Sequence, residues 1–158
     1  AQAPNFRTPL TFGESMTEDV RVALTAQLAA VVKVLKGDSQ NFNAWIKLGT
    51  IRKMTGDYNG AETAWRYAKL LYPKSTVPTD NLGSLYLDFI KDYPKAEINF
   101  KLSISSDSHD INAYEQLVSL YTIYGYGSTS TALALLQKGI AANPGNQTLL
   151  QLQSQLSN

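Results

Sequence analysis

The chain has no cysteine, a single histidine and few charged residues, and these shortages exclude several classes of protein. Without cysteine it can form no disulfide, no thiolate metal site and no cysteine nucleophile. Charged residues make up 17% of the sequence and sum to a formal charge of +1. The clustered basic face that is typical of nucleic-acid-binding proteins is therefore missing, and we expect no nucleic-acid partner.

Long apolar runs are missing as well. The most apolar stretch, residues 23–35, is interrupted by Gln27 and Lys33. It falls short of the roughly 18 to 20 apolar residues that cross a bilayer, so we expect no membrane span in this chain. A signal peptide or membrane anchor upstream of Ala1 stays open. Abundant serine, threonine, asparagine and tyrosine favour an extracytoplasmic location without deciding against the cytoplasm.

What the chain does contain is an internal repeat. Leu48-Gly49 recurs 34 residues later as Leu82-Gly83, and Tyr86 recurs 35 residues later as Tyr121. A period near 34 indicates stacked copies of one small unit. Such units bury only the contacts with their neighbours and leave one long face open to a partner.

Apolar residues three and four positions apart predict helices throughout. The first runs from Ser15 to Lys36, and Ser15 and Glu18 have the spacing of a capping box. Three helix pairs follow, over residues 43–55 and 58–71, 76–90 and 94–105, and 110–124 and 129–142. A last helix over 147–156 has leucines on one side and glutamines on the other, as expected of a terminal cap.

Two other segments lie outside the helices. Residues 1–14 form an extended leader whose Phe6, Leu10 and Phe12 either pack on the first helix or belong to a tether. The period also grows to 35 and then 36 residues between equivalent alanines. We expect the additional residues in the turns at 91–93 and 125–128, because surface turns tolerate insertions.

The pattern of the first unit resembles a tetratricopeptide repeat. The residues that carry this resemblance are Trp45, Leu48, Gly49, Gly56, Tyr58, Ala61, Trp65, Ala68 and Pro73. Arg52 departs from it, since tyrosine is usual there. The second unit has Thr79 in place of the first aromatic residue, and the third has Val118 for glycine and Gly139 for alanine. The match covers residues 43–144.

The resemblance implies an all-α fold, a right-handed superhelix of antiparallel helix pairs. About three repeats would be joined by an N-terminal helix and a C-terminal capping helix in one domain over 1–158. Its expected parts are the leader 1–14, the N-terminal helix 15–37, the repeats 42–75, 76–109 and 110–145, and the cap 146–158.

The resemblance also implies a concave groove lined by the first helix of each pair. The expected partner-binding residues are Asn43, Ile46, Lys47, Thr50, Lys53, Met54, Asp80, Asn81, Ser84, Leu87, Asp88, Asn112, Glu115, Gln116, Ser119 and Ile123. This set mixes amides and hydroxyls with apolar side chains, and its charge changes from basic to acidic along the chain. Amides can satisfy a peptide backbone and apolar residues can anchor side chains, so a protein or peptide partner is expected. The other interpretation is an ordinary solvated face.

Some members of the family bind the terminal carboxylate of a chaperone through paired lysine and asparagine residues. Ile46 and Thr50 occupy two of those positions in this sequence, which argues against that role.

Candidate catalytic groups are sparse. The tetrad Asp107-Ser108-His109-Asp110 suggests a metal or acid–base site, but such sites need more histidine or carboxylate partners. A loop in which Asp110 caps the next helix is the better interpretation. Residues 125–128 lack the lysine of a phosphate loop and are expected to form an elongated turn. We therefore expect no catalytic residue, no metal and no cofactor.

The sequence thus predicts a non-catalytic protein-interaction module that acts as a scaffold or assembly adaptor. The alternative is a structural spacer or self-associating subunit that uses its leader and terminal helix, such as the soluble part of a membrane-anchored or exported protein. Either way we expect a monomer or a weak homo-oligomer.

Overall fold

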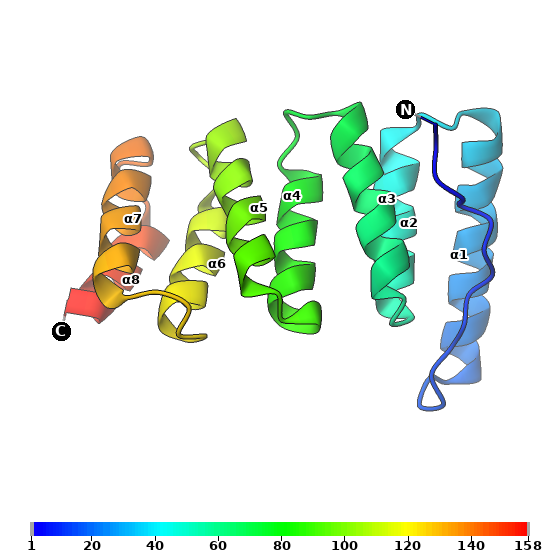
Figure 1. Cartoon of the computed structure of the whole chain (residues 1–158), viewed down its shortest axis with the longest axis horizontal. Helices are drawn as coiled ribbons and strands as arrows, with labels where there is room; N and C mark the ends of the chain where they lie inside the picture. Colours follow the sequence, from blue (N-terminus) through cyan, green and yellow to red (C-terminus); the bar gives the residue numbers. More distant parts are fainter. Residues whose placement is uncertain (1, 158) are drawn as a thin grey trace. The chain divides into compact units, whose positions relative to one another are not determined.

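The computed structural model describes residues 2–157, and all regular elements among them are helices (Figure 1). They divide into two compact units, unit 1 (Ala1–Lys74) and unit 2 (Ser75–Asn158). The predicted all-α architecture of helix pairs is confirmed. Within the described residues no helix is both long and apolar enough to cross a membrane.

Unit 1 contains the leader and three helices, α1 (Glu18–Gly37), α2 (Phe42–Met54) and α3 (Tyr58–Leu71). The α2 and α3 helices form an antiparallel hairpin, and α1 packs on α2. The buried side of α1 contains Leu24, Leu28, Val31 and Leu35, which recur every three or four residues. Its burial against α2 is the main apolar contact of this helix.

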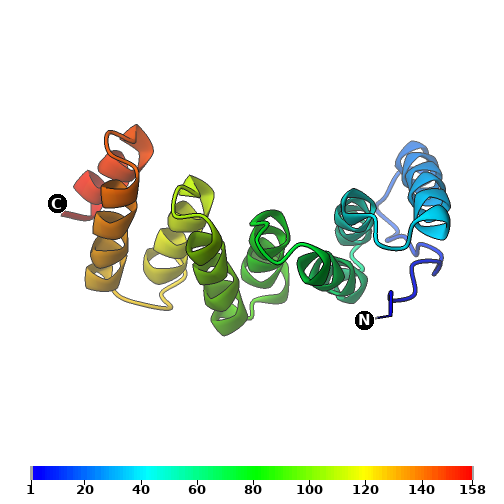
Figure 2. The same ribbon diagram turned by 90° about the horizontal axis from the view of Figure 1, so that it is seen from above.

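Unit 2 contains α4 (Val77–Ser84), the π-helix η1 (Leu85–Ile90), α5 (Tyr93–Ser106), α6 (Ile111–Thr122), α7 (Thr129–Ala142) and α8 (Gln147–Ser157). Each helix packs on the next one along the chain (Figure 2), and α6 also contacts α4 and α8. Leu149 of α8 is buried, whereas the glutamines of α8 lie toward solvent, as predicted for a terminal cap.

Small residues let the two helices of a hairpin approach closely. The indole of Trp65 lies so close to Gly49 that a β-carbon at this position would overlap the ring. In unit 2, a β-carbon at Gly83 would lie 2.6 Å from Cε1 of Phe100. The Trp65 indole N–H also donates to the carbonyl of Ile46, at 3.1 Å. Trp65 of α3 and Phe100 of α5 therefore pack directly on the backbone of the preceding helix of their hairpin.

Most helices begin with a side-chain cap. The acceptors are Asn41, Asp57, Asp92, Asp110 and Ser128, each bonded to a backbone N–H three residues further on. The predicted capping box at Ser15 is wrong, because α1 begins at Glu18 and its N-cap Thr17 makes no side-chain cap bond. Instead a turn precedes the helix, in which the N–H of Met16 donates to the carbonyl of Gly13. The Arg21 guanidinium donates to the carbonyls of Gly13 and Met16.

The longer period of the second repeat arises inside a helix. Lys91 has a positive φ of 63°, like Gly56 in the first repeat with φ 81°. These two residues are 35 positions apart, although Leu48 and Leu82 are 34 apart. The additional residue therefore lies in the π-helix η1, which holds more residues per turn. The prediction that it lies in the turn at 91–93 is wrong.

The second expected insertion is where the sequence predicted it. Gly125 has φ 67° and follows Lys91 by 34 residues, as the regular period requires. The next helix is capped by Ser128, whereas Asp92 caps α5 directly after Lys91. Two additional residues, Tyr126 and Gly127, therefore lengthen this turn.

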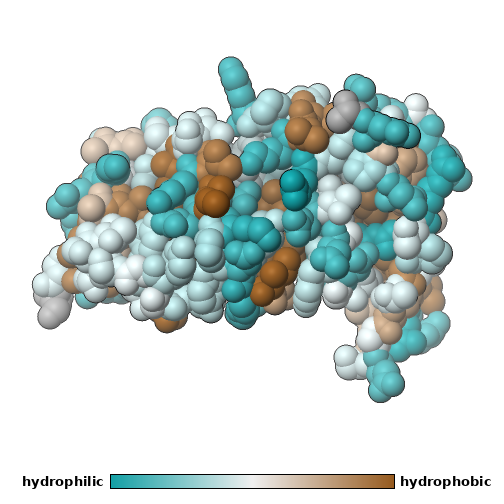
Figure 3. Space-filling view, viewed as in Figure 1, coloured by the Kyte–Doolittle hydropathy of each residue, from teal (hydrophilic) through white to brown (hydrophobic). Residues whose placement is uncertain are grey.

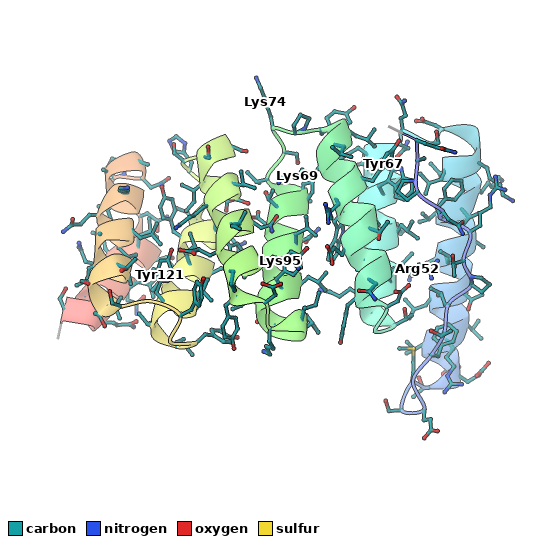
Figure 4. All side chains as sticks on the ribbon, in the orientation of Figure 1. Arg52, Tyr67, Lys69, Lys74, Lys95 and Tyr121 are labelled. Atoms are coloured by element: carbon teal, nitrogen blue, oxygen red, sulfur yellow. The ribbon has the colours of Figure 1, made fainter. Side chains whose placement is uncertain are left out.

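The leader packs on unit 1. The ring of Phe6 meets Trp45 edge-on at 5.9 Å between centroids, and its side chain is buried. Arg52, labelled in Figure 4, is only 4% exposed and donates to the carbonyls of Pro9, at 3.2 Å, and Thr8. It also forms an ion pair with Asp57 at 3.3 Å. The arginine that replaces the usual tyrosine thus holds the leader by its backbone.

We expect Phe6→Ala to destabilise unit 1 by about 2–4 kcal/mol, because the truncated side chain leaves a cavity against Trp45. Both tryptophans, Trp45 and Trp65, belong to unit 1, so urea unfolding followed by tryptophan fluorescence reports on this unit. Thr11→Ala is the control, since Thr11 is an exposed residue of the same leader. Equal stability of the two variants would show that the leader contributes nothing to unit 1.

We expect Gly49→Ala to destabilise unit 1 by about 1–3 kcal/mol, because its methyl group collides with the Trp65 ring. Gly37→Ala is the matched substitution, since no atom lies within 4 Å of a β-carbon at that position. It should be neutral or slightly stabilising, because alanine restricts the unfolded chain more than glycine. The same fluorescence measurement checks both, and a stable Gly49→Ala variant would contradict the close approach.

Candidate partner-binding surfaces

The exposed face of α2 carries all six of the residues predicted for unit 1. They are Asn43, Ile46, Lys47, Thr50, Lys53 and Met54, each exposed or half-buried. The other face of α2 holds buried Trp45, Leu48 and Ile51. Met54 is 52% exposed, which leaves an apolar side chain at the end of this face.

In unit 2 the predicted residues lie on two helices that contact each other, α4 with its extension η1 and α6. Those at the surface are Asp80, Asn81, Ser84, Asp88, Asn112, Glu115, Gln116, Ser119 and Ile123. Ile123 is 78% exposed at the end of α6. The hydroxyl of Tyr124 donates to Asp88 at 3.1 Å and so links the end of α6 to η1.

Leu87 does not belong to this surface. Its side chain is 1% exposed, so the prediction that it is open to a partner is wrong. Leu87 lies in the π-helix, where the wider turn shifts the positions of residues around the helix axis relative to a regular α-helix. The neighbouring Asp88 stays exposed.

The two faces carry opposite charges, as the sequence predicted. The α2 face includes Lys47 and Lys53, whereas the face in unit 2 includes Asp80, Asp88 and Glu115. On the side of the molecule that Figure 3 shows, apolar residues form separate small patches among polar ones.

Asp80 has an unusual environment for a surface carboxylate. Burial and the nearby carboxyl group of Asp110 raise its pKa to about 6, although hydrogen bonds from Ser103 and Thr76 oppose the rise. Ser103 is fully buried, and its hydroxyl lies 2.6 Å from that of Thr79. Asp80 thus connects the exposed face of α4 to a buried polar cluster.

The tetrad around the histidine forms a loop and a helix cap. Asp110 accepts from the N–H of Ala113 at 3.1 Å, which confirms its predicted role at the start of α6. Nδ1 of His109 lies 3.4 Å from Asp107 on the surface. In residues 2–157, no three histidine or acidic residues gather in a way that could hold a metal ion.

Sequence reasoning did not place a cluster of tyrosines in unit 2. The ring of Tyr93 lies 5.6 Å from that of Tyr124 and 6.1 Å from that of Tyr126, and Lys91 Nζ lies 5.4 Å from the Tyr124 ring. Lys91 follows η1, Tyr93 begins α5, and the other two tyrosines lie in the turn after α6. The available signal was the location of the tyrosines in and beside the two turns flagged for insertions.

No family model matches the chain, and no curated protein matches it. Among solved structures it is similar to MamA, with a TM-score of 0.67 and 23% identity over 88% of this chain and 80% of that one. The Arabidopsis OM64 TPR domain has a TM-score of 0.56 and 16% identity over 73% of this chain and 93% of that domain.

A third similar structure is the second TPR domain of human RPAP3, solved in complex with the HSP70 peptide SGPTIEEVD. Its TM-score is 0.54, with 19% identity over 70% of this chain and 89% of that one. The helix pairs, their close contacts and these three likenesses agree, and the chain therefore has the fold of tetratricopeptide-repeat (TPR) domains.

Proposed function

We propose that this protein is a non-catalytic interaction module, a scaffold or assembly adaptor that holds a segment of a protein partner. Each unit offers a face of its own for such a segment, the exposed face of α2 in unit 1 and the exposed face of α4 and α6 in unit 2. The residues proposed to contact it are those predicted from the sequence, with Leu87 removed because it is buried.

The observation that carries the proposal is the division of each of these helices into two faces. On α6, Tyr114, Leu117 and Tyr121 are buried, whereas the other side presents Asn112, Glu115, Gln116 and Ser119. The large side chains are therefore used in packing, and the remaining face offers amides and hydroxyls that can bond a peptide backbone. Exposed Met54 and Ile123 offer apolar contacts for side chains.

The peptide complex of the RPAP3 domain supports a peptide as the class of ligand, because a related fold holds one. It does not transfer the ligand itself. Ile46 and Thr50 stand where carboxylate-binding members of the family have polar or basic partners, so we do not propose a chaperone terminus for this chain.

Charge complementarity specifies the partner further. The lysines of the α2 face favour a segment with acidic residues, and the carboxylates of α4 and α6 favour one with basic residues or amides. We therefore expect the two faces to select segments of opposite charge.

The test uses peptides selected from a random phage-displayed library on the 158-residue chain. A selected peptide should change backbone amide shifts on α2, or on α4 and α6, and not on the exposed sides of α3, α5 and α7. We expect Lys47→Glu to weaken binding about five- to tenfold, because it reverses a charge on the proposed face.

Arg66→Glu is the matched control, since Arg66 is an exposed cation of the same unit on α3. It should leave the dissociation constant within about twofold. Equal losses from the two charge reversals, or shifts confined to α3, α5 and α7, would overturn the proposed surfaces.

A second candidate, self-association, is favoured by the outer side of α1. Val22 is 60% exposed there and lines a shallow hollow with Phe12, Ala26 and Ala29. If copies associate through this side, light scattering should show a mass that rises with concentration, and Val22→Asp should return it to that of one chain. A concentration-independent mass of one chain would exclude this candidate.

A further inference from the structure

Two buried carboxyl oxygens in unit 2 have no hydrogen-bond partner. They are Oδ1 of Asp80, on the first turns of α4, and Oδ2 of Asp110, at the start of α6. The two carboxyl groups interact where α4 packs on α6. Two ionised carboxylates so placed would repel, and neither could donate a hydrogen bond.

The hydroxyl groups around this pair cannot supply the missing donor. Thr79 donates to the carbonyl of Thr76 at 2.8 Å, and the 2.6 Å contact between Thr79 and Ser103 then uses the proton of Ser103. If Ser103 donates to Asp80 instead, Thr79 has one proton for two acceptors. In neither arrangement does a hydroxyl proton lie between Asp80 and Asp110, and the Thr76 hydroxyl is used on Asp80. A proton on one of the two carboxyl groups supplies the hydrogen for that contact.

Asp80 is the better holder of that proton. Oδ1 of Asp110 accepts the N–H of Ala113 as the cap of α6, and the start of a helix favours a negatively charged side chain. The hydrogen bonds on Asp80 come from side chains alone, and its burial favours the neutral form.

The other groups that face the pair do not compete for the proton. Burial raises the pKa of Tyr114 on α6, and the charge of Asp110 raises it further, so this phenol stays neutral at physiological pH. The neighbour on α5 is Ser103, which does not titrate in this range. His109 precedes Asp110 in the chain, but its ring pairs with Asp107. The charged group that acts on Asp80 is therefore Asp110.

We propose that Asp80 and Asp110 share one proton, and that this proton ties the start of α4 to the start of α6. The contact between the two helices is then firm in acidic solution and loosens as the pH rises through about 6. Because Asp80 also belongs to the exposed face of α4, unit 2 carries a pH-sensitive device beside its proposed binding surface.

The direction of the effect follows from linkage. The pKa of Asp80 rises from 3.8 to about 6 on folding, so its stabilising contribution is complete below 3.8 and is lost as the pH rises through 6. With these values the folding equilibrium constant of unit 2 falls about tenfold between pH 5 and pH 8.

The experiment measures hydrogen exchange of the α4 and α6 amides at pH 5 and pH 8, corrected for the intrinsic exchange rates. The protection of these amides gives the folding equilibrium constant of unit 2 within the 158-residue chain. Between pH 5 and pH 8 we expect the folding equilibrium constant of unit 2 to fall about tenfold in the wild type. It should fall little in Asp80→Asn, because the introduced amide donates permanently to Asp110. Asp88→Asn, the same change at an exposed carboxylate of η1, should keep the wild-type dependence. Tryptophan fluorescence gives an internal control, because both tryptophans lie in unit 1.

A carbon-detected titration of the carboxyl groups gives an independent readout that does not need a variant. Asp80 should titrate in a step near pH 6. A step for Asp80 below about pH 4.5, or a wild-type pH dependence that persists in Asp80→Asn, would overturn the proposal. If Asp80→Asn does not fold, Asp110→Asn retains the cap and should shift the step of Asp80 toward lower pH.

Discussion

The close approach of two helices over a glycine is the constraint on which the rest of each hairpin depends. When Trp65 packs on Gly49, or Phe100 on Gly83, the contact fixes how the first helix is rotated about its axis. That rotation decides which side chains become core and which face outward. In the third pair the side chains on both helices change in size. Val118 replaces the glycine with a larger side chain, Leu136 replaces the aromatic ring with a smaller one, and both are buried. The volume at the contact is maintained by compensation, as close packing requires.

This constraint explains why so much of the fold could be predicted from the sequence. Glycine, alanine and aromatic residues recur about every 34 positions because the same contact between two helices forms in each repeat. The period in the sequence therefore indicates how the helices pack. The caps at Asp57, Asp92 and Asp110 are local signals of the same kind, since each acts within three residues. Where the signal was local but ambiguous, as at Ser15, a competing turn held by Arg21 took its place.

The features that could not be predicted depend on residues far apart or on backbone geometry. In the sequence, Arg52 departs from the repeat pattern without an evident reason. The structure explains it, because its guanidinium donates to carbonyls more than 40 residues earlier. A one-residue insertion can widen a helix or lengthen a turn, and composition does not distinguish the two. In the second repeat it widened the helix, which also removed Leu87 from the predicted surface. Likewise, Asp80 and Asp110 are 30 positions apart and become a pair only when α4 packs on α6.

The candidate site follows from the same division of each helix. Packing determines the inner face, so the residues of the outer face are free to differ between repeats without cost to the hairpin. They do differ, since lysines on α2 are replaced by carboxylates on α4 and α6. Asp80 is where the two faces meet, because its carboxyl group reaches the buried Ser103 while its helix position belongs to the outer face. A proton there acts on the contact between α4 and α6, directly beside the surface that a partner would meet.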